Sequence, residues 1–230
     1  RIILLNKCDV ADEAATAKWI KYFADNGSFA IPVDCRSGKG LNAYRPLVKE
    51  VLKEKIRANT EKGMAGKALR VMVVGIPNTG KSSFINKMAG KNRAQVADKP
   101  GVTRQKQWIR VKENIELLDT PGILWPKFDE EVVALNLASL TAIKEEILPI
   151  DKVVIHILNI LDKYYNEILV SRYGIEHIDN EEIEETLDII GKKRGCLMRG
   201  GIVDYDKVFN VVMNDIKTGN LKGITFDRYE

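Results

Sequence analysis

A glycine-rich segment in the middle of the chain has the residue types that bind phosphate groups. Its sequence, GIPNTGKS at 75–82, matches the pattern GxxxxGK[ST] and lies between an apolar run and a helical pattern. The glycines let several backbone N–H groups turn toward one phosphate, and the following helix adds the positive end of its dipole. Lys81 would reach the β- and γ-phosphates of a nucleotide, and Ser82 would bind Mg²⁺. Further phosphate contacts are expected at Asn78, Thr79, Gly80 and Ser83.

A second motif, Asp119-Thr120-Pro121-Gly122, follows a predicted strand. A carboxylate at the end of a strand can hold Mg²⁺ through water, and the N–H of Gly122 can contact the γ-phosphate. Asp119 comes 38 residues after Lys81, a spacing at which two neighbouring strands can bring both side chains to one metal. Between them, Thr103 in the segment PGVTR is expected as a second Mg²⁺ ligand.

A third motif, Asn6-Lys7-Cys8-Asp9, is suited to reading a base. The carboxylate of Asp9 can accept hydrogen bonds from N1–H and the 2-amino group of guanine, a pattern that adenine lacks. The stem of Lys7 can cover the plane of the base, and Asn6 can tie this loop to the glycine-rich loop. Together with the other two motifs, this tetrapeptide predicts guanine rather than adenine as the base.

The order of the three motifs is unusual. The residues resemble the translation-factor branch of P-loop GTPases, in which the base-reading motif comes last, but here it precedes the glycine-rich loop by 69 residues. Either the domain is circularly permuted, or Asn6–Asp9 closes a preceding nucleotide-binding domain that the sequence does not contain. The second interpretation requires another base-reading motif after Asp119, and the sequence has none. The order therefore favours circular permutation.

A permuted domain followed by a helical region is similar to the YlqF/RbgA family of ribosome biogenesis GTPases. The resemblance covers essentially the whole chain and includes Gly75–Ser83, Asp119–Gly122, the segment 100–104 and the later stretch KKRGC at 192–196. It implies a cytoplasmic GTPase that acts late in maturation of the large ribosomal subunit, with GTP or GDP and Mg²⁺ as ligands. It also implies that Asn78 is a candidate K⁺ ligand, although this side chain could instead stabilise the loop.

Two features depart from the family pattern. The family has a further N-terminal segment with a strand, so we expect this chain to be a fragment whose sheet has an exposed edge or a gap. The second base-contacting loop usually contains Ser-Ala, whereas here Asp34-Cys35-Arg36-Ser37 occupies that place. Since that loop reads the base through backbone N–H groups, Cys35 and Arg36 are expected to contact guanine.

The sequence provides no evident group to position the attacking water. Many GTPases have a glutamine directly after the DxxG motif, but this chain has Ile123 there. His156 and His177 lie in the acidic helical region and are expected to be surface or half-buried helix residues, so the catalytic residue stays unassigned. We expect slow intrinsic hydrolysis that a ribosomal partner stimulates. The alternatives are a guanine-nucleotide-gated RNA-binding scaffold without hydrolysis and a different permuted ribosome-associated GTPase.

Strand and helix patterns place these motifs in an α/β fold. We expect a mostly parallel sheet with helices on both faces in residues 1–128, followed by a small all-α domain in residues 129–230. In the first half the expected strands are 1–5, 29–33, 69–74, 107–111 and 115–118, and the expected helices are 11–26, 41–58 and 81–89, with Asp12 as an N-cap and 60–67 as a linker. In the second half the expected helices are 130–147, 151–170, 180–191 and 204–217.

Composition and charge agree with a folded protein that meets a polyanion. The chain has 230 residues, 45% of them hydrophobic, and its three cysteines form no CxxC pair, which argues against a zinc site or disulfide framework and favours a reducing cytoplasm. Residues 1–128 carry a net charge of +12 and residues 129–230 a net charge of −8, although two ordinary solvated surfaces explain the same counts. No membrane or DNA partner is expected. Together with the family resemblance, the basic cluster implies contacts to ribosomal RNA at Lys192, Lys193, Arg194 and Arg199, although without that resemblance the same residues fit a solvated connector between helices.

Overall fold

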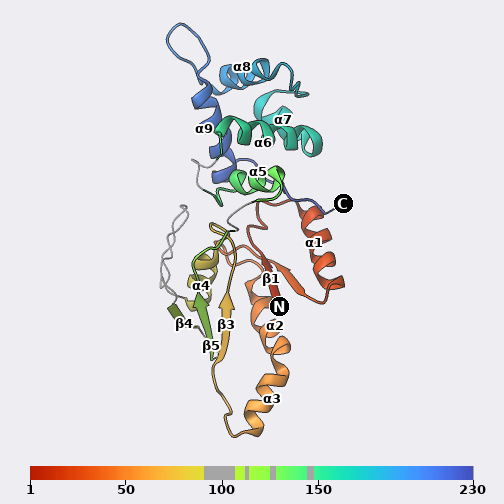
Figure 1. The fold of residues 1–230 in the computed structure, drawn as a ribbon, viewed down its shortest axis with the longest axis vertical. Helices are drawn as coiled ribbons and strands as arrows, with labels where there is room; N and C mark the ends of the chain where they lie inside the picture. The colour runs from red at the N-terminus through yellow and green to blue at the C-terminus, as the bar shows by residue number, and fades with distance from the viewer. Residues whose placement is uncertain (91–106, 112–113, 125–127, 144–147, 230) are drawn as a thin grey trace. The chain divides into compact units, whose positions relative to one another are not determined.

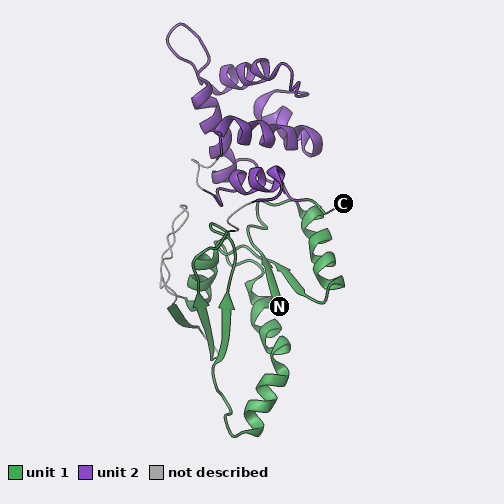
Figure 2. Cartoon of the chain, viewed as in Figure 1, with its two compact units in different colours: residues 1–126, 228–230 green, residues 127–227 purple. Residues whose placement is uncertain are grey.

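A computed structural model describes residues 1–90, 107–111, 114–124, 128–143 and 148–229. The chain divides into two compact units, coloured separately in Figure 2. The first comprises Arg1–Pro126 together with Arg228–Glu230, and the second comprises Lys127–Asp227. No helix among the described residues is both long and apolar enough to cross a lipid bilayer.

The first unit alternates short strands with helices (Figure 1). In chain order its elements are β1 (Ile2–Leu5), α1 (Glu13–Asp25), β2 (Phe29–Pro32), the 3₁₀ turn η1 (Leu41–Ala43), α2 (Tyr44–Val51), α3 (Lys53–Glu61), β3 (Leu69–Val73), α4 (Lys81–Ala89), β4 (Gln107–Val111) and β5 (Ile115–Asp119). These elements confirm the predicted α/β class. The strands lie within a residue or two of their predicted positions.

The strands pair mostly in parallel, as the sequence predicts, but they form two sheets instead of one. β1 pairs in parallel with β2, with Ile2 opposite Phe29. β5 pairs in parallel with β3 on one side and antiparallel with β4 on the other. A cavity of about 550 Å³ lies between the two sheets and is lined by residues of both β1 and β3. The two sheets are thus separated by a partly apolar space and are not joined edge to edge.

Buried side chains of α2, α4 and β5 belong to one hydrophobic core in this unit. Ile85 of α4 and Ile115 and Leu117 of β5 are completely buried. The ring of Tyr44 meets the ring of Phe84 edge to face, with the two centroids 4.9 Å apart. This packing holds the N-terminus of α4 next to the carboxyl ends of β3 and β5, where the phosphate and metal motifs begin.

Asp12 caps α1, as the sequence predicts. Its Oδ1 accepts a hydrogen bond from the backbone N–H of Ala15 at 3.0 Å, which satisfies one of the free donors at the helix start. Its Oδ2 pairs with Nη1 of Arg228 at 2.7 Å. The ring of Tyr229 lies 4.7 Å from that of Tyr22, so the last residues of the chain pack on the helix that follows the base-reading motif.

The prediction of one continuous helix over 41–58 is wrong, because the structure has a 3₁₀ turn and two separate helices there. A 3₁₀ turn precedes α2, and Leu52 separates α2 from α3 with φ −105° and ψ 13°. Leu52 is half-buried against the core of the unit, and no glycine or proline marks the break. α3 then continues to Glu61, into the segment predicted as a linker.

The second unit is helical in its described residues. Its helices are α5 (Glu131–Ser139), α6 (Ile150–Tyr164), α7 (Asn166–Tyr173), α8 (Ile183–Arg194) and α9 (Tyr205–Thr218). The helix predicted over 151–170 is divided at Tyr165, whose φ is −141°. The hydroxyl of Tyr165 accepts from the N–H of Thr225 at 3.0 Å, so this residue connects the α6–α7 corner to the chain after α9.

A buried carboxylate ties α7 to α9 inside this unit. Asp215 is 2% exposed and forms an ion pair with Arg172. It also accepts hydrogen bonds from the hydroxyl of Tyr173 at 2.9 Å and from Nδ2 of Asn220 at 3.0 Å. Burial raises the pKa of Asp215, but the hydrogen bonds from Arg172, Asn220 and Tyr173 outweigh burial and lower the pKa below its ordinary value.

The substitution Asp215→Asn is expected to destabilise the helical unit by about 3 kcal/mol at neutral pH, because it leaves Arg172 without its ionic partner. Since the pKa of Asp215 is lowered in the folded state, its contribution is present above the ordinary carboxyl pKa and disappears as the pH falls through the folded value. Urea unfolding at neutral and acidic pH measures both effects. The exposed Asp206→Asn, on the same helix, is the control, and an equal loss in both variants would contradict this role.

Candidate nucleotide-binding site

One side chain of the predicted base-reading motif contacts both the glycine-rich loop and the 34–37 loop. Nδ2 of Asn6 donates to the carbonyl oxygen of Thr79 in the glycine-rich loop at 2.8 Å. Oδ1 of the same residue accepts from the N–H of Cys35 at 3.1 Å. The base-reading motif therefore lies next to the phosphate motif in space, although 73 residues separate Asn6 from Thr79 in the chain. This contact is the one that the sequence predicts for Asn6.

Gly80 makes that approach possible. Its φ is +89°, in the left-handed region, and a Cβ added to it would lie 2.2 Å from Nδ2 of Asn6. Any side chain at this position would therefore strain the backbone and collide with the bridging amide. Asn78 and Lys7 also have left-handed φ values, of 58° and 62°, which are uncommon outside glycine and are typical of functional loops.

The DTPG motif at the end of β5 packs directly against the glycine-rich loop. A Cβ on Gly122 would lie 2.7 Å from the backbone nitrogen of Pro77, so only glycine fits between these two segments. The hydroxyl of Thr120 donates to the carbonyl of Val73 at 2.6 Å and fastens the end of β5 to the end of β3. The sequence analysis missed this role of Thr120, which depends on the pairing of two strands distant in the chain.

Lys81 and Asp119 form the charged centre of the site. Nζ of Lys81 donates to the carbonyl of Ile76 at 2.8 Å. Burial lowers the pKa of Lys81, and the negative charge of Asp119 partly offsets this by raising it. Asp119 is completely buried, and neither carboxylate oxygen accepts a hydrogen bond from the residues that the structure describes. Burial raises the pKa of Asp119. The side chain of Gln107, the charge of Lys81 and the backbone N–H of Thr120 oppose that rise, although neither donor has the geometry of a full hydrogen bond to the carboxylate.

The residues around Asp119 fit a magnesium ion. A buried carboxylate without hydrogen-bond partners is costly, and a hard cation that takes oxygen ligands relieves that cost. Asp119 ends β5, and Ser82 lies in the first turn of α4, which begins after the loop that DTPG touches. Thr103, the other predicted metal ligand, lies outside the described residues.

The base-reading side chains lie at the surface beside the bridge. Lys7 and Asp9 are exposed, and the N–H of Cys8 between them donates to the carbonyl of Val33 at 3.1 Å. This bond anchors the motif to the end of β2. The arrangement leaves the side chain of Asp9 accessible to a ligand while its backbone is held in place.

The 34–37 loop uses its N–H groups differently from the expectation. The N–H of Cys35 donates to Asn6, and the N–H of Arg36 donates to Oδ1 of Asp34 at 2.8 Å. Nζ of Lys87 on α4 donates to the carbonyl of Arg36 at 3.2 Å. A base contact through Cys35 and Arg36 would therefore have to replace or share these bonds, and it stays a prediction. The thiol of Cys35 is buried, which raises its pKa to about 11.

Both histidines belong to the helical unit. His156 is half-buried in the helical unit, where Nε2 lies 2.7 Å from Oδ1 of Asn136 and burial lowers its pKa. His177 is exposed and pairs with Asp162 at 2.8 Å. Ile123, directly after the DTPG motif, is 74% exposed and has no group that could orient water.

The substitution Gly80→Ala is expected to weaken guanine-nucleotide binding by roughly 100-fold, since a clash with Asn6 and a strained φ together cost about 2–3 kcal/mol. Gly27→Ala is the matched control. Gly27 also has a left-handed φ, of +68°, but a Cβ there meets nothing within 4 Å. Titration with GDP measures the difference, and equal affinities for the two variants would show that the Asn6–Gly80 contact does not support the site.

Comparison with known proteins agrees with this geometry. A family model described as "50S ribosome-binding GTPase" matches residues 70–196. The ribosome biogenesis GTPase A of Bacillus cereus is 45% identical over 230 residues, which are all of this chain and 77% of that protein. The protein of the same name from Thermotoga maritima is 31% identical, across 100% of this chain and 76% of its own length.

A solved structure gives the same fold. The GNP-bound YlqF from T. maritima matches 99% of this chain and 81% of its own, with a TM-score of 0.62 at 28% identity. The extent of these matches and the spatial convergence of loops in a permuted order lead to one assignment. The chain belongs to the ribosome biogenesis GTPase A (YlqF) family, and it is a GTPase whose nucleotide-binding domain is circularly permuted.

Proposed function

We propose that this GTPase binds GTP or GDP with Mg²⁺ and uses GTP hydrolysis to control its association with the maturing large ribosomal subunit. The observation that supports this most strongly is the Asn6 bridge, because it places a guanine-type motif against a phosphate-type loop. The relatives named ribosome biogenesis GTPase A and the family description of a 50S ribosome-binding GTPase supply the ribosomal context.

The phosphates would lie over the loop from Gly75 to Ser82, at the N-terminus of α4. The Lys81 ammonium would leave the carbonyl of Ile76, its present partner, and turn to the β- and γ-phosphates. Asp119 and Ser82 would hold the metal, with Thr103 as a further proposed ligand. Mg²⁺, when bound, neutralises charge on the phosphate oxygens. The N–H of Gly122 would donate a hydrogen bond to the γ-phosphate. The position of the residues that follow Gly122 would then depend on whether GTP or GDP is bound.

The base would lie between the exposed side chains of the Asn6–Asp9 motif and the 34–37 loop. Asp9 would accept from guanine N1–H and its 2-amino group, and Lys7 would cover one face of the ring. Asn6 would act as a positioning residue. It keeps the distance between base site and phosphate site fixed, which is what one nucleotide bound at both ends requires.

Hydrolysis by the chain alone is proposed to be slow. The position after DTPG is Ile123, and both histidines have partners within the helical unit, so we propose that the group that orients the attacking water comes from the ribosomal partner. Asn78 is proposed as a ligand for K⁺, which would add positive charge next to the transferred phosphate. The alternative is that nucleotide binding alone, and not hydrolysis, controls RNA binding, and a phosphate-release measurement on the ribosomal complex separates the two.

The helical unit is proposed to contact ribosomal RNA. Lys192, Lys193 and Arg194 form the last turn of α8, and Arg199 lies in the turn of the small hairpin that follows; all four side chains are exposed. Exposed basic side chains of this kind contact RNA phosphates. The proposed location is the cytoplasm, because the proposed function is ribosome assembly.

Single-turnover GTP hydrolysis should be slow for the protein alone and at least about 10-fold faster with large-subunit precursors, since the partner would complete the catalytic site. Rates should also be higher in K⁺ than in Na⁺ at equal ionic strength. Mature small subunits serve as the control particle. Fast hydrolysis that is the same with and without precursors would contradict the proposal, and identical rates in the two salts would reject the potassium role.

A further inference from the structure

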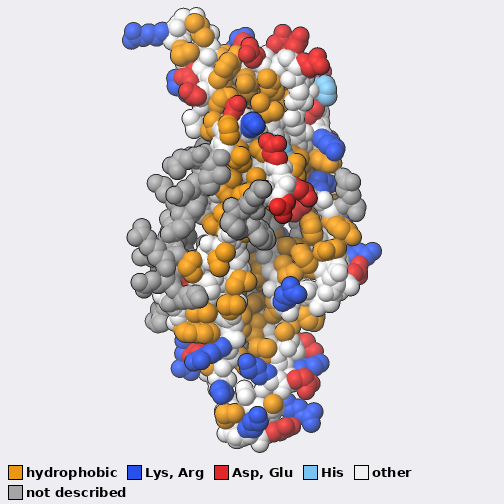
Figure 3. All heavy atoms as spheres, in the orientation of Figure 1, with side chains coloured by type: hydrophobic (Ala, Val, Ile, Leu, Met, Phe, Trp, Pro, Cys, Tyr) orange, Lys and Arg blue, Asp and Glu red, His pale blue; other side chains and the backbone are white. Residues whose placement is uncertain are grey.

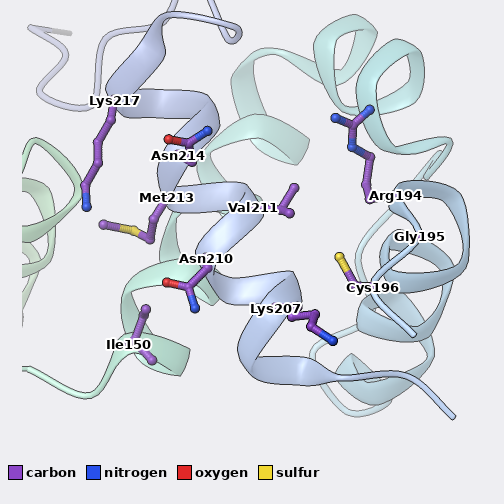
Figure 4. Close-up of a pocket in the computed structure, with 10 residues that line it drawn as sticks. All are labelled: Ile150, Arg194, Gly195, Cys196, Lys207, Asn210, Val211, Met213, Asn214 and Lys217. Atoms are coloured by element: carbon purple, nitrogen blue, oxygen red, sulfur yellow. The ribbon is translucent and has the colours of Figure 1, made fainter. Parts of the chain in front are cut away.

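A shallow groove of about 550 Å³ follows one side of α9 in the helical unit. Lys207, Asn210, Asn214 and Lys217 project from that helix along the groove, and Arg194 and Cys196 lie across from it (Figure 4). The spacing of the four α9 residues repeats every three or four positions, which puts them on one helical face. Ile150, Val211 and Met213 supply apolar surface in the same groove.

The charge of this groove is opposite to that of the unit around it. Residues 129–190 contain 15 acidic and only 4 basic residues, and acidic side chains gather around α8 on the face shown in Figure 3. Its basic lining residues are Arg194, Lys207 and Lys217, and among the residues that the structure describes no acidic side chain lines it. Nζ of Lys207 pairs with Asp204 at 3.0 Å, but 58% of the lysine side chain stays exposed. A cationic strip within an acidic surface is selective for an anionic ligand.

We infer that this groove binds the phosphate backbone of folded RNA, with Lys207 and Lys217 on phosphates and Asn210 and Asn214 on ribose hydroxyls. The inference rests on the proposed ribosomal function and adds a site to it, because α9 contains none of the residues predicted above to contact RNA. Arg194, at the end of α8, belongs to both sets and would connect the groove to the basic turn before it.

The dimensions and side chains of the groove fit an RNA strand. Lys207 and Lys217 are ten residues apart on α9, or about 15 Å along the helix axis. A stacked strand carries one phosphate for about every 3.4 Å of axis, so the groove faces several phosphates. An asparagine amide can both accept from and donate to a 2′-hydroxyl, the group that distinguishes RNA from DNA. An acidic peptide would use the lysines but would have no comparable use for the two amides.

The test compares two double variants of the full chain that remove the same charge from the same unit. Lys207→Gln with Lys217→Gln alters the groove, and Lys152→Gln with Lys163→Gln alters α6. Lys152 matches Lys207 in side-chain exposure, at 58%. Binding to a fluorescent, fully paired RNA hairpin is measured by anisotropy over a range of salt concentrations. A DNA hairpin of the same sequence and polyglutamate are the competitors, and thermal unfolding and basal GTP hydrolysis are recorded for every protein.

The groove variant is expected to bind the RNA hairpin about 10- to 100-fold more weakly near 0.1 M salt, and its salt dependence should be shallower by about two units of slope. The α6 variant should bind like the wild type, and basal hydrolysis should be unchanged in both.

Three results would overturn the inference: wild-type affinity in the groove variant, an equal loss in both variants, or a wild-type protein that prefers polyglutamate to RNA. If one of these results is found while precursors still stimulate the wild type, only the groove is rejected. If precursors fail to stimulate the wild type, the proposed function itself fails.

Discussion

The two hydrogen bonds of Asn6 hold the nucleotide site together. A base-reading loop and a phosphate-binding loop recognise one nucleotide only if the distance between them is fixed, and here one amide side chain reaches both Thr79 and Cys35. Gly80 leaves room for that amide, and its left-handed backbone turns the loop into the first residue of α4. The permuted order of the motifs is compatible with function because this contact depends on spatial proximity and not on chain order.

A second constraint concerns charge. Asp119 is buried at the end of β5 with no hydrogen bond to its oxygens from the described residues, and burial raises its pKa. The next residues hold this carboxylate in place: Thr120 donates a hydrogen bond to the end of β3, and Gly122 packs against the glycine-rich loop. The carboxylate is thus fixed in an unfavourable environment that a divalent cation improves.

Much of this arrangement could be predicted from local sequence signals. Residue type and spacing predict three of its features: the cap at Asp12, the start of α4 at Lys81 and the contact of Asn6 with the glycine-rich loop. The breaks at Leu52 and Tyr165 could not be predicted, because both residues are compatible with a helix and tertiary contacts decide there. The division into two sheets and the contact of Lys87 with the 34–37 loop depend on which distant segments meet, and periodicity does not encode that.

The most direct test of the central claim is a calorimetric titration of the protein with GDP and with ADP, each with Mg²⁺. Asp9 and Lys81 should bind the two ends of the same nucleotide, so GDP should bind at least about 1,000-fold more tightly than ADP. In Asp9→Ala most of that preference should disappear, because the carboxylate that distinguishes guanine is lost. Equal affinities of the wild-type protein for GDP and ADP would contradict the claim that the loops held by Asn6 enclose one guanine nucleotide.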